Sequence, residues 1–361
     1  MNPTSLYIHI PFCFRKCLFC SFVIAVAQDH RREEYVKALI LEMKKHEGGN
    51  LKTIYFGGGT PSMLDENHLD VLMDAIGKNF SFQNDIEITI EANPESIGPS
   101  KARYLKARGF NRVSLGVQSL QDRYLRFLGR NHDAQKARDA HRILREAGFA
   151  NINLDLMYAF PGQTEEELQE DVRAIARLGS EHLSLYTLTI EPNSRFHAVQ
   201  VKLDDDEKLA RQYLMIARIL DEYGLGQYEV SNFAKPGFGS QHNRNYWLGG
   251  PYLGLGVGAH GFDGRRRYWN TSNLQEYIQR ASSAGQLIDG FEDLTDAQLT
   301  MEKLLFGLRM NEGVPWALVP PVKAGLLQTW VKDGFLLLEN ENLKATDRGR
   351  LILDELSARL I

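Results

Sequence analysis

The sequence predicts an α/β protein whose main part is a partial, open (β/α)6 barrel, followed by a small winged-helix-like unit at the C-terminal end. Six short apolar segments rich in β-branched residues alternate with segments of helical periodicity, the pattern of right-handed β–α–β units around a parallel sheet. Strands this apolar suit a sheet covered on both sides. Six units are fewer than the eight of a closed barrel, so we expect a lateral gap.

Each expected strand is followed by at least one expected helix. The strands are SLYIHI (5–10), KTIYFGG (52–58), IEITIEA (86–92), RVSLGVQ (112–118), INLDLMY (152–158) and HLSLYTL (182–188). The helices span residues 32–45, 65–80, 100–109, 122–129, 134–148, 164–179 and 205–224.

Polar or glycine residues stand at or near the carboxyl ends of four of these strands. They are Glu91, Gln118, Asp155 and the glycines Gly57–Gly59. Each one alone is better explained as a helix N-cap or as a satisfied polar group. Because sites in parallel α/β folds collect at the carboxyl ends of strands, the four together indicate a site at this end of the barrel.

The chain changes character after about residue 235. Residues 235–264 are rich in glycine and aromatic residues and show no helical period. Helices are expected around 272–285 and 296–311, and residues 328–360 follow a helix–strand–turn–strand–helix pattern. We therefore expect a core domain over residues 1–235 and an accessory domain over residues 236–361 that covers part of the lateral gap.

The composition excludes several classes of partner. The 361 residues carry a formal net charge of −4, which gives no general attraction to nucleic acid or anionic membranes. The sequence has no run of about 18 apolar residues, and its first residues, MNPTSLYIHIPF, lack the regions of a signal peptide. The clustered cysteines suit a reducing compartment, so we expect a cytoplasmic protein that does not bind nucleic acid.

All three cysteines lie in the stretch CFRKCLFC, as Cys13, Cys17 and Cys20. Thiolates at such short spacing let one loop surround a metal centre. With His9 they would form a tetrahedral zinc site, but structural zinc usually pairs two separated ligand groups. An electron-transfer [4Fe–4S] cluster ordinarily takes four cysteines. Three would leave one iron open, and the missing ligand would be a small molecule.

The spacing Cys-x3-Cys-x2-Cys after the first strand resembles that of the radical S-adenosylmethionine (SAM) superfamily, in which SAM chelates the open iron through its amino and carboxylate groups. The resemblance covers essentially the whole chain and indicates the HemN/HemW family of oxygen-independent coproporphyrinogen III oxidase-like proteins. Its motifs are YIHIPFC (7–13), FGGGTPS (56–62), IEANPE (90–95), SLGVQS (114–119), LGRNH (128–132) and DLMYAFPGQT (155–164).

The resemblance implies a set of SAM-binding residues. Phe19 would pack against the adenine, and Arg130 would bind the SAM carboxylate. Gly58, Gly59 and Thr60 would meet the amino group through backbone atoms, since glycine allows a close approach. The remaining implied contacts are Tyr7, Glu91, Gln118 and Asp155, with Tyr186, Thr187, Ala259 and His260 as further members of the pocket.

Two departures separate this chain from the oxidase branch. The oxidase has a fourth cysteine where this chain has Phe22, and it has a long arm before the cluster that we do not expect here. Residues 242–247, HNRNYW, instead match the HNxxYW signature of the HemW branch, which is described as heme chaperones. Residues 293–299 and 307–314 also resemble that branch.

His242 is accordingly the expected heme-binding residue. An imidazole can ligate heme iron, and neighbouring aromatic rings can stack on a porphyrin. In the alternative interpretation, Tyr246 and Trp247 are core residues between the domains and His242 is a hydrogen-bonded loop histidine. Spacing alone favours this alternative, whereas the resemblance favours heme.

Two functional hypotheses follow from the resemblance. The first is a heme chaperone that holds a [4Fe–4S] cluster on the three cysteines, binds SAM and heme, and passes heme to an acceptor apo-protein, which can be membrane-associated. A reductant protein would serve the cluster. The second is an enzyme that cleaves SAM to a 5′-deoxyadenosyl radical and acts on a tetrapyrrole propionate, as coproporphyrinogen III dehydrogenase does. Pure electron transfer would leave the SAM motifs unexplained.

Overall fold

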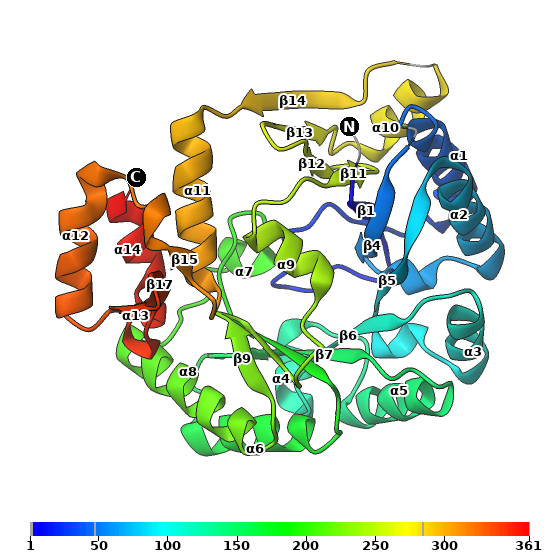
Figure 1. Cartoon of the computed structure of the whole chain (residues 1–361). Coiled ribbons are helices and arrows are strands. Elements are labelled where there is room, and N and C mark those ends of the chain that lie inside the picture. The colour runs from blue at the N-terminus through cyan, green and yellow to red at the C-terminus, as the bar shows by residue number, and fades with distance from the viewer. Residues whose placement is uncertain (1–2, 47, 284, 361) are drawn as a thin grey trace.

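The computed structural model describes residues 3–46, 48–283 and 285–360, and its main feature is a nine-stranded sheet in the order β11-β1-β4-β5-β6-β7-β8-β10-β9. Six parallel strands form its centre in chain order: β1 (Ser5–Ile10), β4 (Asn50–Gly58), β5 (Ser81–Ala92), β6 (Arg112–Gln118), β7 (Ile152–Tyr158) and β8 (His182–Thr187). The sheet curves without closing (Figure 1). This confirms the predicted partial barrel of six β/α units.

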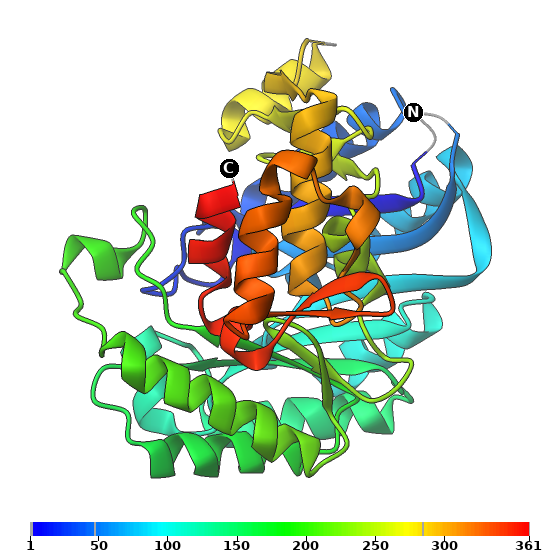
Figure 2. The ribbon, with the colours of Figure 1, turned by 60° about the vertical axis from the view of Figure 1, so that its left-hand side comes forward.

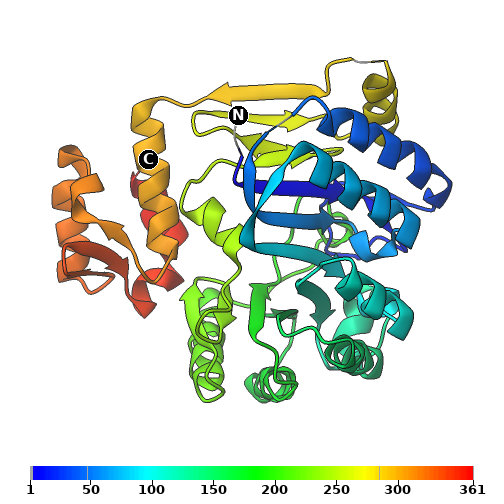
Figure 3. The same ribbon diagram turned by 45° about the vertical axis from the view of Figure 1, so that its right-hand side comes forward.

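Helices cover the outer side of the sheet, as Figures 1 and 3 show. They are α1 (Arg32–Met43), α2 (Glu66–Asn79), α3 (Pro99–Ala107), α4 (Asp122–Leu128), α5 (Ala134–Glu146), α6 (Glu165–Ala176) and α8 (Asp206–Asp221). The short α7 (Arg195–Ala198) lies instead against the cysteine loop, where the Phe196 N–H donates to the Leu18 carbonyl oxygen. Local capping fixes several starts: at α6, Thr164 and Glu167 form a reciprocal capping box. The apolar faces of α1, α2, α3, α5, α6 and α8 pack on the outward side chains of the strands and form the main core. Buried residues of α4 and α7 belong to a smaller cluster beside the cysteine loop.

The strands differ from the expectation in one respect, because their inner faces are not apolar. Successive side chains of a strand point to opposite faces. In β6, Val113, Leu115 and Val117 belong to the fully buried core, whereas Arg112, Ser114, Gly116 and Gln118 line a cavity inside the barrel. The same alternation places Asn153, Asp155 and Met157 of β7 in that cavity.

Three further strands extend the sheet at its two edges. The antiparallel pair β9 (Gly226–Glu229) and β10 (Asn232–Ala234) follows β8, and β11 (Leu253–Leu255) pairs in parallel with β1. Residues beyond 235 therefore contribute to the main sheet. The domain boundary at 235 stays a prediction.

The region expected to lack helical structure contains a short helix, α9 (Gln241–Trp247). The prediction was wrong because Ser240 caps this helix by accepting a hydrogen bond from the backbone N–H of Asn243, a local effect that hydrophobic periodicity does not record. A second sheet follows, formed by β12 (His260–Phe262), β13 (Arg266–Asn270) and β14 (Ile288–Asp293), with α10 (Leu274–Ser282) between β13 and β14.

The C-terminal unit has its own core and the predicted winged-helix-like order. It contains α11 (Asp296–Arg309), β15 (Val314–Pro315), α12 (Pro321–Lys332), β16 (Leu336–Glu339), β17 (Asn342–Ala345), α13 (Asp347–Leu351) and α14 (Leu353–Leu360). The core includes Leu327, Trp330, Leu343 and Leu356, and Figure 2 shows the unit standing beside the open side of the sheet. Within the described residues, no helix is long and apolar enough to cross a membrane.

Candidate cofactor and ligand site

A cavity of about 420 Å³ opens at the carboxyl ends of the parallel strands and extends into the barrel. It lies where parallel α/β folds place their sites. The sequence-predicted residues that line it are Cys13, Cys17, Phe19, Cys20, Gly58, Gly59, Glu91, Gln118, Arg130, Asp155, Tyr186 and Thr187. Twelve side chains or backbone segments from distant parts of the chain thus meet at one place.

The cysteine loop forms one wall of this cavity. Its three thiols are half-buried and form no disulfide. Short strands β2 (Phe12–Cys13) and β3 (Ala25–Val26) pair at its base, and the Leu18 N–H donates to the Leu128 carbonyl oxygen at 3.0 Å. Burial raises the pKa of Cys13 to about 11, so a metal must displace its proton to bind the thiolate.

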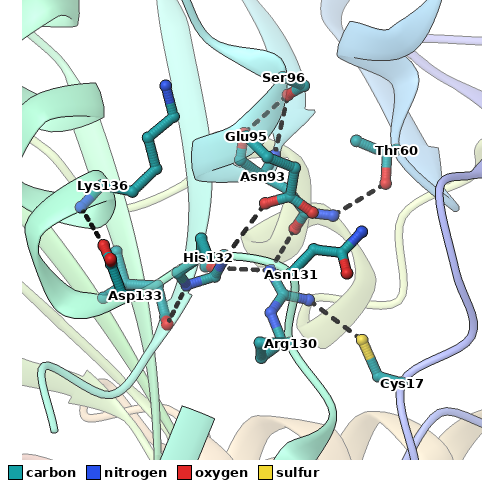
Figure 4. Close-up of polar contacts among 12 residues, drawn as sticks. Cys17, Thr60, Asn93, Glu95, Ser96, Arg130, Asn131, His132, Asp133 and Lys136 are labelled. Carbon is teal, nitrogen blue, oxygen red and sulfur yellow. Dashed lines mark hydrogen bonds and ion pairs between the residues drawn. The ribbon is translucent and has the colours of Figure 1, made fainter. Parts of the chain in front are cut away.

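A chain of polar contacts connects two of the thiols along the cavity wall, and Figure 4 shows the part that runs from Cys17 to Thr60. The Arg130 guanidinium donates from Nη1 to Cys17 Sγ at 3.3 Å and from Nη2 to Asn93 Oδ1 at 2.6 Å. Asn93 Nδ2 donates to Thr60 Oγ1 at 2.9 Å, and that hydroxyl lies 3.3 Å from Cys13 Sγ. Arg130 and Thr60 therefore orient the cysteine loop. Arg130 also lines the cavity, whereas Thr60 lies behind its wall.

The glycine motif is tightly packed against the segment that leads into the cysteine loop. A Cβ at Gly59 would lie 2.6 Å from the Pro11 carbonyl oxygen, and one at Gly58, where φ is +115°, would meet the His9 ring. The N–H groups of Gly58, Gly59 and Thr60 donate to Glu91, Ile10 and Phe12. A ligand amino group would consequently meet this motif through carbonyl oxygens.

Two carboxyl groups stand inside the barrel below the cysteines. Glu91 accepts hydrogen bonds from Tyr55 Oη at 2.8 Å and from the Gly58 N–H at 3.0 Å. Asp155 accepts one from Asn153 Nδ2 at 2.8 Å. Burial raises the pKa of Glu91 to about 7 and that of Asp155 to about 6. Such perturbed carboxyl groups in a cleft are typical of binding sites for cationic or hydroxyl-bearing ligands.

Gln118 has an uncommon backbone conformation for its residue type. Its φ is +68°, in the left-handed region that non-glycine residues rarely adopt, and the β6–β7 register shifts between Leu115 and Gln118. Strained residues of this kind concentrate at functional sites. Here the distortion ends β6 and places Gln118 in the cavity wall.

Four predicted pocket residues do not line the cavity. Tyr7 lies behind the wall, stacked on Tyr55 with ring centroids 6.2 Å apart, and Thr60 is buried beside Cys13. Ala259 is buried elsewhere, and His260 is exposed and stacked on Trp269. None of the four is among the residues that a ligand in the cavity would touch directly.

The His9 ring is committed to other partners, which argues against the zinc alternative. Its Nε2 lies 2.8 Å from the Val23 carbonyl oxygen and its Nδ1 lies 3.1 Å from Tyr7 Oη. Among the described residues, no three His, Cys, Asp or Glu side chains are grouped to hold a single metal ion. The three thiols with an adjoining cavity fit a cluster that leaves one position for a further ligand.

His242 lies on α9 below the cavity and does not line it. The side chain is 1% exposed; its Nδ1 lies 2.8 Å from Thr53 Oγ1, and its Nε2 lies 2.8 Å from Tyr246 Oη. The ring also stacks on Tyr55 at 5.0 Å between centroids. Burial lowers its pKa to about 3, so His242 is neutral and both of its ring nitrogens are occupied in this arrangement.

The rest of the HNRNYW segment makes mixed contacts. Trp247 packs against Phe306 of α11 and lies under the Arg309 guanidinium, 4.4 Å from the ring centroid. Asn243, by contrast, reaches the cavity. The segment therefore connects the C-terminal unit with the floor of the barrel.

Several cavity residues were missed by sequence reasoning. They are Tyr55, Asn93, Arg112, Ser114, Asn153, Ser184 and Asn243. A period-2 reading of β6 and β7, counted backwards from Gln118 and Asp155, would have found Arg112, Ser114 and Asn153. Asn243 had no such signal, because its helix was not predicted.

Comparisons with known proteins identify the class and then the family. The model of the Radical SAM superfamily matches residues 7–175. The chain is 34% identical to a protein of Mycobacterium tuberculosis named heme chaperone HemW, over 100% of this chain and 95% of that protein. It is 38% identical to the Bacillus subtilis protein of that name (86% and 84% of the two chains) and 34% identical to the Escherichia coli one (99% and 97%).

A solved structure agrees with these relatives. The radical SAM enzyme coproporphyrinogen III oxidase (HemN) from Escherichia coli superposes with a TM-score of 0.86 at 26% sequence identity, covering 99% of this chain and 90% of that one. The chain belongs to the HemW family of the radical SAM superfamily. The resemblance read from the sequence is thereby confirmed.

Proposed function

We propose that this protein is a heme chaperone that binds a [4Fe–4S] cluster, SAM and heme, and transfers the heme to an acceptor apo-protein. The observation that carries the proposal is the cavity walled by three half-buried thiols, in a chain whose full-length relatives bear the name heme chaperone. The acceptor, which can be membrane-associated, and a reductant protein for the cluster belong to the same proposal.

The cluster and SAM would be held by the upper part of the cavity. Cys13, Cys17 and Cys20 would ligate three irons, and the fourth iron would take SAM; when bound, the reduced cluster supplies an electron that can cleave SAM. Arg130 supports a carboxylate at this end, since its Nε has no partner among the described residues. Glu91 and Asp155 suit the ammonium and ribose groups.

Heme is proposed to bind at the HNRNYW segment, with His242 as its iron ligand. The hydrogen bonds from His242 to Thr53 and Tyr246 must then be exchanged for the iron bond. Since the imidazole is already neutral, no proton has to leave before the iron binds. Heme loading is consequently expected to be accompanied by a movement of α9.

A transfer experiment tests the proposal. The cluster-loaded protein is incubated anaerobically with heme, separated from free heme, and mixed with apomyoglobin as a surrogate acceptor. We expect heme to co-elute with the protein and then to appear in the acceptor, followed by visible absorbance. Failure to retain heme through gel filtration would contradict the proposal.

The enzyme alternative has one structural observation in its favour, the close superposition on HemN. The absence of a fourth cysteine argues against it: Phe22 stands at that position and is 67% exposed. Anaerobic incubation of the reduced, SAM-loaded protein with coproporphyrinogen III decides between them. Loss of carbon dioxide from this substrate would favour the enzyme.

A further inference from the structure

We propose that Arg112, at the inner end of the cavity, is the anchoring residue for a carboxylate of a bound ligand. This carboxylate site is separate from the one that Arg130 offers beside the cysteines. The inference deepens the proposed function, because a heme propionate is one source of such a carboxylate. The methionyl carboxylate of SAM is the other.

Arg112 is a buried cation for which the described part of the chain supplies no directly contacting counter-ion. Its side chain is 1% exposed, one of the largest fully buried side chains of the chain. Among the described residues its Nε has no hydrogen-bond partner, and neither Glu91 nor Asp155, the two carboxyl groups whose pKa its charge lowers, is hydrogen-bonded to it. An unpaired buried charge is costly, and the group faces the cavity, so a ligand from the cavity can supply the missing anion.

The groups around Arg112 are polar but already occupied with one another. His182 lies 2.6 Å from Asn153 Oδ1 through Nδ1 and 2.9 Å from Tyr228 Oη through Nε2. Burial, and next the Arg112 charge, lower the pKa of both His182 and His242, which keeps these rings neutral. Neither ring therefore competes with Arg112 as a cation.

The neighbouring carboxyl groups do not neutralise Arg112 by direct contact. The Glu91 carboxylate is held by Tyr55 and the Gly58 N–H, and Asp155 is held by Asn153. Arg112 acts on both only at a distance, lowering pKa values that burial raises. The full hydrogen-bonding capacity of its guanidinium toward a planar carboxylate is left for a ligand.

The position of Arg112 along β6 separates it from the cluster end. Arg130 donates to the carbonyl oxygen of Gly116 on β6 at 2.8 Å. Arg112 lies four residues before Gly116 on that strand, which corresponds to roughly 13 Å at a strand rise of about 3.3 Å per residue. A carboxylate that reaches the open iron beside the cysteines is served by Arg130. Arg112 suits a second carboxylate that enters more deeply, with Asn243 of the HNRNYW segment as a neutral neighbour in the cavity wall.

The test compares ligands with and without carboxylates on the cluster-loaded protein. Wild type, Arg112→Met and Arg112→Lys are titrated anaerobically with SAM, heme and heme dimethyl ester. If heme supplies the carboxylate, Arg112→Met weakens heme binding roughly 10- to 100-fold, the loss typical of a hydrogen bond to a charged group. Heme dimethyl ester then binds wild type and variant equally, and Arg112→Lys retains part of the affinity.

The outcomes distinguish heme from SAM as the source of the carboxylate. They also distinguish failure of the Arg112 site from failure of the proposed heme-chaperone function. If Arg112→Met loses affinity for SAM but not for heme, the carboxylate site is supported and is assigned to SAM. This assignment holds even if the wild-type protein binds no heme, in which case only the proposed heme function fails. Equal affinities of wild type and Arg112→Met for SAM and heme would overturn the inference. An equal loss for heme and its dimethyl ester would also overturn it, because the residue would then be structural. Iron content and circular dichroism show whether each variant folds. If Arg112→Met does not fold, the inference is tested by the heme affinity of Arg112→Lys and by whether the wild-type protein binds heme more tightly than its dimethyl ester.

Discussion

The cysteine loop and the HNRNYW segment, which forms α9, were both expected to bind ligands, but their side chains differ in burial and in hydrogen bonding. The three thiols of the loop are half-buried in a cavity wall and form no disulfide. The His242 ring on α9 is fully buried, stacked and hydrogen-bonded through both nitrogens. The thiols of the loop could thus take up the proposed cluster where they stand, whereas the proposed heme ligand on α9 would first have to give up contacts that stabilise the fold.

The largest effect is expected from substitutions in the cysteine loop. Changing Cys13, Cys17 or Cys20 to Ala removes one of three thiolates, and we expect complete loss of the iron–sulfur absorbance after anaerobic reconstitution. Phe22→Ala is the matched control, since this exposed neighbour should leave the cluster intact. Four irons per chain in any one of the cysteine variants would refute the assignment.

A smaller effect is expected inside the cavity. Asp155→Asn keeps the shape of the side chain but removes its charge, and should weaken SAM binding roughly 10- to 100-fold while the cluster remains. Asp171 is a matched control: its pKa is also raised by burial to about 6, but it bonds to Ser119 and the Leu120 N–H, outside the cavity. Calorimetric titration checks both; equal losses for Asp155→Asn and Asp171→Asn would make the role of Asp155 structural.

The pH dependence of SAM binding is a second test of the carboxyl groups in the cavity. Burial raises the pKa of Glu91 to about 7 and that of Asp155 to about 6, so both are increasingly protonated below these values. A cationic ligand favours the ionised carboxylates, and SAM affinity should therefore rise about tenfold between pH 5.5 and 8. Glu91→Gln should flatten the upper part of this profile. A pH-independent affinity at constant cluster absorbance would speak against these contacts.

The smallest expected effect concerns the bonds that restrain His242. Thr53→Val leaves His242 Nδ1 without its partner and should lower the free energy of unfolding by about 1–3 kcal/mol. Heme affinity should rise a few-fold, because one competing bond is gone. Thr89→Val on the neighbouring strand is the control, since the buried Thr89 hydroxyl has no hydrogen-bond partner among the residues that the structure describes. Weaker heme binding in Thr53→Val would indicate that His242 acts from its present position.

Much of the fold could be predicted because its signals are local. The six core strands, their order and most helices follow from apolar periodicity and from the handedness of β–α–β units. The edge strand β11 could not be found this way, since it pairs with β1 almost 250 residues away in sequence. Helix α9 escaped because its start depends on the Ser240 cap and on Glu87, which accepts from the Gln241 and His242 N–H groups.

The site was predictable to the extent that motifs name residues. The cysteines and most implied SAM contacts do line one cavity. Arg112 was overlooked because only the carboxyl end of its strand was considered, although the period-2 alternation of β6 places Arg112 on the same face as Gln118. A hydrogen-bonded His242 was one of the two interpretations of the sequence, but its partners could not be named, since Thr53 and Tyr55 meet its ring only in the folded chain.

The most direct test is an anaerobic heme titration of the cluster-loaded protein, followed by visible absorbance, for wild type, His242→Ala and His141→Ala. His141 of α5 is the matched control because it is also buried, burial lowers its pKa as it does that of His242, and it lies outside the cavity. The heme-chaperone account predicts saturable one-to-one binding that His242→Ala weakens by about tenfold or more and that His141→Ala leaves unchanged. The absence of saturable binding to the wild-type protein would contradict it.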